Sequence, residues 1–140
     1  LLGFSTQVSQ TIYLNQGTLV FDNQPCPVYQ FNFSTTFDTA EAIIKINTRD
    51  TLNLIVKNNL AEAHTIAFEN YREITIAPSS EEIITLFANQ KKSIAFYDIE
   101  KKFRYVGISS AIIFETPNCA AFLWNLREFD NLLNQEVLKG

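Results

Sequence analysis

The sequence is poor in the side chains that build metal centres and catalytic sites. Its 140 residues include one histidine, two cysteines and no methionine. The four glycines lie far apart, at positions 3, 17, 107 and 140, so no glycine-rich loop is available to hold a phosphate. A single imidazole supplies only one ligand of a metal site and only one member of a catalytic triad. The sequence therefore predicts no catalytic site in this chain.

Positive charge is scarce as well. Lysine and arginine together number 11 against 15 aspartates and glutamates, which gives a net charge of -4 at pH 7. Without a basic cluster, the chain has little with which to neutralise the phosphates of a nucleic acid. No apolar run approaches the length of about 20 residues that a membrane-spanning helix needs. We therefore expect no nucleic-acid partner and no membrane span.

What the sequence does contain is a high apolar content arranged in short strands. Hydrophobic residues make up 46% of the chain and include 12 phenylalanines, enough to fill the core of one domain. About eight to ten strand-like runs are separated by turn residues, a spacing typical of an antiparallel sandwich or barrel. Within this pattern we expect a hairpin turn at residues 15–17 (NQG). We expect irregular chain at residues 22–27 (DNQPCP), because two prolines fall there.

The clearest pattern runs through residues 50–70 (DTLNLIVKNNLAEAHTIAFEN). Apolar residues at positions 52, 54 and 56 alternate with mostly polar ones, as in a strand with one buried face. The pair Asn58-Asn59 then ends the run, because short amide side chains bond their own backbone and tolerate turn dihedrals. A second strand follows, with Ile66 and Phe68 on one face.

This order of residues resembles the stretch of plastocyanin-like cupredoxins that carries their first copper ligand. The shared order is a strand, Asn-Asn, four residues, His-Thr-Ile, one residue, Phe and an acidic residue, and His64 falls on the ligand position. Residues 49–52 (RDTL) and 58–60 (NNL) further resemble the first cupredoxin domain of multicopper oxidases. The resemblance covers roughly residues 40–115. It implies an all-β fold, a cupredoxin-like Greek-key β-sandwich.

The copper ligands of that family are largely missing. In mononuclear cupredoxins a cysteine and, three positions later, a second histidine are ligands, and the matching residues here are Asp98 and Lys101. In multicopper oxidases, four histidines of the trinuclear cluster match Ala67, Glu69, Asp98 and Glu100. The resemblance thus implies a domain with no copper of its own. Any copper would belong to other domains of a parent multicopper oxidase.

His64 has two interpretations. As a remnant of the scaffold, it is a partly exposed histidine at the end of a loop that makes one hydrogen bond. We favour this interpretation, because a lone histidine without convergent partners is a poor metal site. As a metal ligand, His64 would need acidic residues or donors from a partner chain.

Three carboxylates are weak candidates for another kind of metal site. If the resemblance holds, Glu69, Asp98 and Glu100 lie near one end of the sandwich, and several oxygen donors together hold a hard cation such as calcium. Lys101 and Lys102 stand beside them in the sequence. A solvated, charge-balanced rim is therefore the favoured prediction.

The two ends of the chain differ from residues 11–117, which we assign to the cupredoxin-like domain. Residues 1–10 (LLGFSTQVSQ) turn from apolar to small and polar, like the remnant of a secretory signal or an ordinary N-terminal tail. Residues 118–140 predict an amphipathic C-terminal α-helix that packs on its own sandwich or connects to another domain. Cys26 and Cys119 are either one disulfide or two buried thiols. The apolar stripe of the helix consists of Phe122, Leu126, Phe129, Leu133 and Val137.

The expected function is that of a copper-free structural or interaction domain in a larger exported protein, periplasmic or extracellular, that resembles a multicopper oxidase. Its expected partners are other domains of that protein or a second copy, through the C-terminal helix. One alternative is a copper-binding module in which His64 acts with acidic residues or a partner chain. Another is a secreted sandwich that binds carbohydrate or protein through aromatic loop residues such as Tyr71 and Tyr105.

Overall fold

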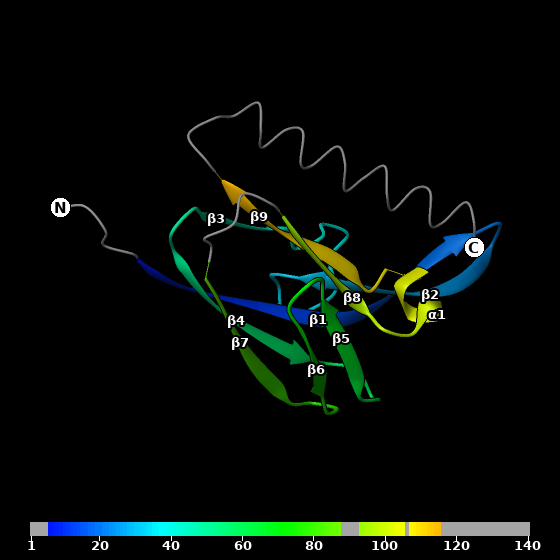
Figure 1. Ribbon diagram of the computed structural model, residues 1–140. Helices are drawn as coiled ribbons and strands as arrows, with labels where there is room; N and C mark the ends of the chain where they lie inside the picture. Colours follow the sequence, from blue (N-terminus) through cyan, green and yellow to red (C-terminus); the bar gives the residue numbers. More distant parts are fainter. Residues whose placement is uncertain (1–5, 88–92, 106, 116–140) are drawn as a thin grey trace.

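Two β-sheets packed face to face form the protein (Figure 1). The computed structural model describes residues 6–87, 93–105 and 107–115, and this part of the chain contains nine strands and one short α-helix. The predicted all-β sandwich is confirmed. The predicted C-terminal helix over residues 118–140 lies outside the described residues, and so does Cys119.

One sheet has four strands in the order β2-β1-β4-β7. β1 pairs antiparallel with β2 and parallel with β4, and β4 pairs antiparallel with β7. β1 begins at Gln7, so the first strand reaches into the N-terminal segment 1–10. The bounds are β1 (Gln7–Phe21), β2 (Gln24–Asn32), β4 (Thr51–Asn58) and β7 (Glu81–Phe87).

The other sheet has five strands in the order β3-β9-β8-β5-β6. β3 pairs parallel with β9, and the remaining pairs are antiparallel. The sequence pattern predicted an antiparallel sandwich, but two of its strand pairs, β1–β4 and β3–β9, are parallel. Between the two strands of each parallel pair, the chain passes through the opposite sheet. The bounds are β3 (Ile44–Asn47), β5 (His64–Phe68), β6 (Arg72–Ile76), β8 (Ile94–Asp98) and β9 (Ser109–Glu115).

A short helix, α1 (Lys101–Tyr105), lies between β8 and β9. No helix within the described ranges is long and apolar enough to cross a membrane.

The first hairpin turn lies further along the chain than the sequence predicts. Residues 15–17 are part of β1, and the chain turns at Asp22 and Asn23, whose φ angles are 51° and 61°. Two consecutive positive φ angles are typical of the tight turn whose twist matches the flanking strands. Gly17 serves close packing instead, because a Cβ at this position would lie 2.3 Å from the ring of Phe37.

Residues 22–27 are also more regular than expected, because Pro25 and Pro27 both lie in β2. They stand opposite Val20 and Thr18 of β1. β2 is an edge strand, and a proline is tolerated at an edge where its missing N–H would point to solvent. The two prolines therefore match the place of β2 in the sheet.

The core lies between the sheets and is built by residues that alternate with exposed or partly exposed ones. Leu52 on β4 and Ile66 on β5 are among the fully buried residues. Three rings join the two layers, with Phe31 edge-on to Phe96 and Phe96 stacked on Phe68, both at 5.1 Å between centroids. This alternation decides which side chains of β5 and β8 point inward at the candidate site.

Candidate functional site

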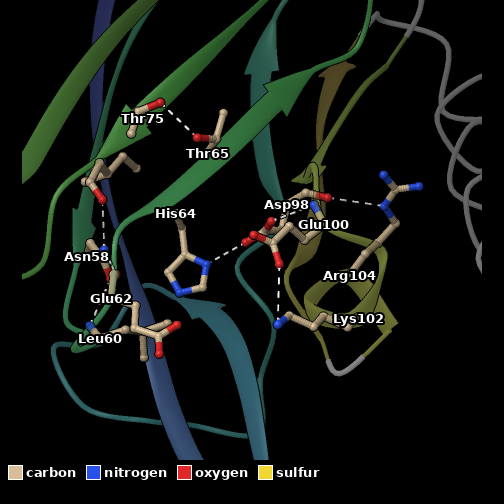
Figure 2. Close-up of polar contacts among 11 residues, drawn as sticks. Asn58, Leu60, Glu62, His64, Thr65, Thr75, Asp98, Glu100, Lys102 and Arg104 are labelled. Atoms are coloured by element: carbon tan, nitrogen blue, oxygen red, sulfur yellow. Dashed lines mark hydrogen bonds and ion pairs between the residues drawn. The ribbon is translucent and has the colours of Figure 1, made fainter.

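The loop before His64 is held by the buried amide of Asn58 (Figure 2). Its Nδ2 donates to the carbonyl oxygens of Glu62 at 2.8 Å and Ile76 at 3.0 Å. Its Oδ1 accepts from the backbone N–H of Leu60 at 2.9 Å. These bonds fold residues 59–62 against the end of β6, where Ile76 pairs with His64. Asn58, the first residue of the Asn-Asn pair, thus acts as a clamp on the loop that positions His64.

Asn59 extends this polar network toward the first two strands. Its Nδ2 donates to Asn15 Oδ1 at 2.8 Å, and Asn15 Nδ2 donates to Asn32 Oδ1 at 3.1 Å. Asn32 in turn donates to the carbonyl oxygens of Asp38 and Ala40. Among the described residues, no buried side-chain nitrogen or oxygen lacks a hydrogen-bond partner. The network therefore ties the loop after β2 to the loop that precedes the histidine.

His64 and Asp98 form a buried pair at the ends of two neighbouring strands (Figure 2). His64 opens β5, Asp98 closes β8, and Nδ1 lies 2.6 Å from Oδ2. A carboxylate only accepts hydrogen bonds, so the imidazole donates from Nδ1. The two side chains are 3% and 2% exposed.

This burial corrects two expectations from the sequence. His64 is not a partly exposed loop histidine, and Asp98 does not belong to a solvated rim. The reason is the register: Asp98 pairs with Ile66, and paired residues of neighbouring strands share a face of the sheet. Asp98 therefore points into the core on the same side as His64, two residues before Ile66.

The carboxylate and backbone of Asp98 are fixed by the segment that follows β8. Oδ1 accepts from the backbone N–H of Glu100 at 2.9 Å, and the Asp98 N–H donates to the carbonyl of Ile108 at 3.0 Å. The Asp98 carbonyl accepts from Nε of Arg104 at 3.4 Å. Asp98 is thus held in place independently of His64.

Phe103 of α1 packs edge-on against the imidazole, with ring centroids 4.7 Å apart and planes at 79°. Tyr29 supports Phe103 from the other sheet, with centroids 5.9 Å apart. Lys101, at the position of the second histidine ligand in the resemblance, is exposed. Sequence reasoning missed Phe103, whose one signal is its place as an aromatic residue among charged ones in residues 100–105 (EKKFRY).

The other carboxylates do not join this pair. Glu69 and Glu100 are exposed, and Glu100 lies 3.6 Å from Lys102 in a surface ion pair. β8 ends at Asp98, so the strand alternation that would bring Glu100 to the same side stops there. Within residues 6–87, 93–105 and 107–115, no three His, Cys, Asp or Glu side chains are placed to hold a metal ion.

The residues around His64 do not fit a type 1 copper ion, which takes two imidazoles and a thiolate. The structure places one imidazole, one carboxylate and one phenyl ring there. Cys26 is a half-buried free thiol near the hairpin end of β2, opposite Leu19. A hard cation such as calcium needs several oxygen ligands. Beside His64 the structure places one buried carboxylate, that of Asp98, and this carboxylate already accepts two hydrogen bonds.

A histidine oriented by a carboxylate is also two-thirds of a nucleophilic triad. The third member would be a hydroxyl or thiol within hydrogen-bond reach of the second ring nitrogen. In the part of the chain that the structure describes, Asp98 is the hydrogen-bond partner of the His64 side chain, and no hydroxyl or thiol contacts the ring in this way. The pair joins the start of β5 to the end of β8.

Tyr71, an aromatic candidate for ligand binding, braces an edge strand. Its ring is 55% exposed, but its hydroxyl donates to the carbonyl of Thr85 on β7 at 2.9 Å. The neighbouring Arg72 donates to the carbonyl of Ile83 at 3.4 Å. The side chain of Tyr105, the second such candidate, is outside the described part of the structure.

Comparisons with known proteins agree with the β-sandwich. No protein-family model and no curated protein matches the sequence. Among solved structures, a multi-copper oxidase from Pediococcus acidilactici superposes with a TM-score of 0.63 at 16% identity, over 77% of this chain and 25% of that one. A multicopper oxidase from Campylobacter jejuni, a metallo-oxidase, gives 0.64 at 16% identity, over 80% and 26%. Copper nitrite reductase from Nitrosomonas europaea gives 0.63 at 12% identity, over 81% and 43%.

The fold is that of the cupredoxin-like domains found in multicopper oxidases, as the resemblance in residues 40–115 predicted. The chain spans from a quarter to less than half of the length of these proteins.

Proposed function

We propose that this chain is a copper-free, cupredoxin-like structural or interaction domain of a larger protein related to multicopper oxidases. The observation that carries the proposal is the buried pair. The imidazole at the family's first ligand position donates to a carboxylate, and this carboxylate belongs to the residue at the family's cysteine position.

The pair opposes metal binding through Nδ1 of His64, the atom that donates to Asp98. A metal that took His64 through Nδ1 would first have to break the bond to Asp98. Leaving a buried charged group without its partner costs about 3–5 kcal/mol. Phe103 adds an apolar ring against the imidazole, where a metal site would need another donor.

The proposed partners are other domains of the same protein or a second copy, with residues 118–140 as the segment that leads from β9 to them. Contact surface of this kind is supported by exposed apolar side chains on the described strands. Val20 and Phe21 near the hairpin turn are 67% and 57% exposed, and Ile83 and Phe87 on β7 are 54% and 51% exposed. Apolar side chains of this size are common anchors in protein interfaces.

Copper titration of the whole chain tests the copper-free proposal. We expect Cu(II), and Cu(I) under reducing conditions, to show no stoichiometric binding by calorimetry, and any weak binding to be equal in wild type and His64→Gln. The matched control is Glu69→Gln, which changes an exposed residue. Stoichiometric binding lost in His64→Gln and kept in Glu69→Gln would overturn the proposal and favour a metal module built on His64. Circular dichroism of each variant shows whether the sandwich is folded.

Export to the periplasm or the extracellular space is part of the same proposal, supported by the resemblance to the first domain of multicopper oxidases. Cell fractionation of the full gene product tests this part. The full reading frame on both sides of this chain tests whether it is a domain of a larger protein related to multicopper oxidases. His-x-His and His-Cys-His motifs downstream would support a working oxidase, and their absence would leave a purely architectural protein.

A further inference from the structure

The outer face of the four-stranded sheet exposes apolar side chains on β4 and β7, which lie side by side at one border of the sheet (Figure 1). On β7, Ile84 and Leu86 belong to the core between the sheets. Neighbouring residues of a strand point to opposite faces, so Ile83 and Phe87 point away from that core. They are 54% and 51% exposed. Ile55 of β4 stands directly opposite Ile83 and is partly exposed, so two isoleucines lie side by side on this outer face.

The register of β4 with β7 arranges this face in rows of matched chemistry. On one side of the isoleucine row, Asn53 stands opposite Thr85, and the Thr85 hydroxyl donates to Asn53 Oδ1 at 2.9 Å. On the other side, Lys57 stands opposite Glu81. Residues two apart in a strand share a face, so all these side chains point outward. The face therefore has an apolar row between a polar row and a row with one charge of each sign.

The two charges of that last row are not spent on each other. Nζ of Lys57 lies 5.7 Å from the ring centroid of Tyr13, the residue opposite it on β1. Glu81 is exposed. In the part of the chain that the structure describes, carboxylates form ion pairs at Asp98 and Glu100 but not at Glu81. The ammonium and the carboxylate both remain available to a partner.

We propose that this face binds the same face of a second copy, related by a two-fold axis that runs between β4 and β7 and parallel to them. The rotation lays β4 of each copy over β7 of the other. Every row then meets itself with its members exchanged. Lys57 faces Glu81 of the second copy, and Glu81 faces its Lys57. Ile55 meets Ile83 of the second copy in the same way, so the apolar row is covered on both copies.

A second copy fits these charges better than an acidic or a basic partner does. A surface of one sign would attract one of the two charges and repel the other. The orientation is also defined. A two-fold axis across the strands would lay Glu81 against Phe87 of the second copy, and a charge loses its water there without gaining a hydrogen-bond partner. The inference rests on the interaction role proposed above and names its partner.

The contact closes at two copies, because the same patch is used on both. The seven residues of β7 extend about 24 Å, and β4 and β7 are about 5 Å apart. The shared area is therefore at the small end of the range for specific interfaces, which is typical of weak, reversible complexes.

An exchange of the two charges tests the proposal in the full chain. Sedimentation velocity at rising concentration, up to about 1 mM, should show a reversible equilibrium between monomer and dimer. Lys57→Glu and Glu81→Lys each place like charges in contact twice per dimer, so each should weaken the dimer about tenfold or more. The double variant restores opposite charges and should return to within about threefold of wild type. A monomer at every concentration, growth beyond the dimer, or no recovery in the double variant would overturn the proposal.

A second pair of variants tests the apolar row. Ile83→Ser should weaken the dimer about tenfold, because it removes an apolar side chain from the centre of the contact. Ile99→Ser is the matched control: Ile99 follows β8 in the other sheet, is 44% exposed, and should leave association within about twofold of wild type. Equal association in the two variants would contradict the proposal. Circular dichroism shows whether each variant is folded.

The copper titration remains a separate measurement. A chain that is monomeric and binds no copper would remove this dimer and leave the copper-free proposal intact.

Discussion

Near the end of β8, two acidic residues, Asp98 and Glu100, each pair with a basic side chain, and the two pairs differ in distance and in burial. His64 and Asp98 are 2.6 Å apart with side chains 3% and 2% exposed. Lys102 and Glu100 are 3.6 Å apart with side chains 73% and 58% exposed. The first pair joins two strands of the sheet through the core, and the second joins neighbouring residues at the surface (Figure 2).

The difference shows that depth, rather than residue type, decides what a carboxylate contributes here. An exposed pair is screened by water and contributes about 0–1 kcal/mol. A buried pair gains little over a well-packed apolar one, but the loss of one member is costly because the other stays buried without a partner. The structural role of Asp98 and the near-neutral role of Glu100 should therefore separate in mutagenesis.

The largest expected effect is that of Asp98→Ala. The change leaves His64 buried without its acceptor and frees the N–H of Glu100, so we expect a loss of about 3–5 kcal/mol in the free energy of unfolding. Urea denaturation measures the loss. Asp98→Asn keeps an acceptor for Nδ1 and should lose clearly less. A loss below about 1 kcal/mol in Asp98→Ala would show that the pair is not a structural element.

The second largest effect is expected for Asn58→Ala, with a loss of about 2–3 kcal/mol in the free energy of unfolding. The reason is that two backbone carbonyls and one backbone N–H lose their buried partner. The same change releases the loop before His64, so hydrogen exchange of residues 60–64 should speed up as well. Asn47→Ala is the control, since it removes an exposed asparagine at the end of β3. Equal exchange in the two variants would remove the clamp role of Asn58.

Phe103→Leu should cost about 0.5–1.5 kcal/mol, because it keeps an apolar side chain in α1 but loses the edge-on contacts with His64 and Tyr29. The comparison variant is Phe103→Leu in the Asp98→Asn background. If the ring stabilises the oriented imidazole, the two effects will not be additive in thermal melts.

The smallest effect on the free energy of unfolding is expected for Glu100→Gln. This change removes the surface ion pair with Lys102 but keeps the backbone N–H of Glu100, which donates a hydrogen bond to Asp98. We expect a change below about 0.5 kcal/mol that vanishes in high salt. A loss as large as that of Asp98→Asn would erase the contrast between the two pairs.

The strands and the Asn-Asn turn were predictable because their signal is local. Alternation at positions 52, 54 and 56 depends only on which face of one strand is buried, and β4 shows this pattern. The burial of Asp98 depends on its register with Ile66 across two strands that are far apart in the sequence, which one sequence does not display. The acidic residues at 98 and 100 therefore look alike in the sequence and differ in the structure.

The hairpin turn was misplaced for a similar reason. The sequence pattern predicts a turn at Gly17, but in the structure the ring of Phe37 packs against this glycine. The true turn at Asp22 and Asn23 carries a local signal, since both residue types tolerate positive φ. The neighbouring prolines concealed this signal, although an edge strand accepts them.

The hydrogen bonds from Tyr71 and Arg72 to the edge strand β7 affect whether strands of other copies of the domain can pair with this edge of the four-stranded sheet. They occupy carbonyl oxygens of Ile83 and Thr85, which an incoming strand would otherwise use. At the opposite border of that sheet, Pro25 and Pro27 offer no N–H to a newcomer. These features at both borders of the four-stranded sheet oppose growth by strand addition.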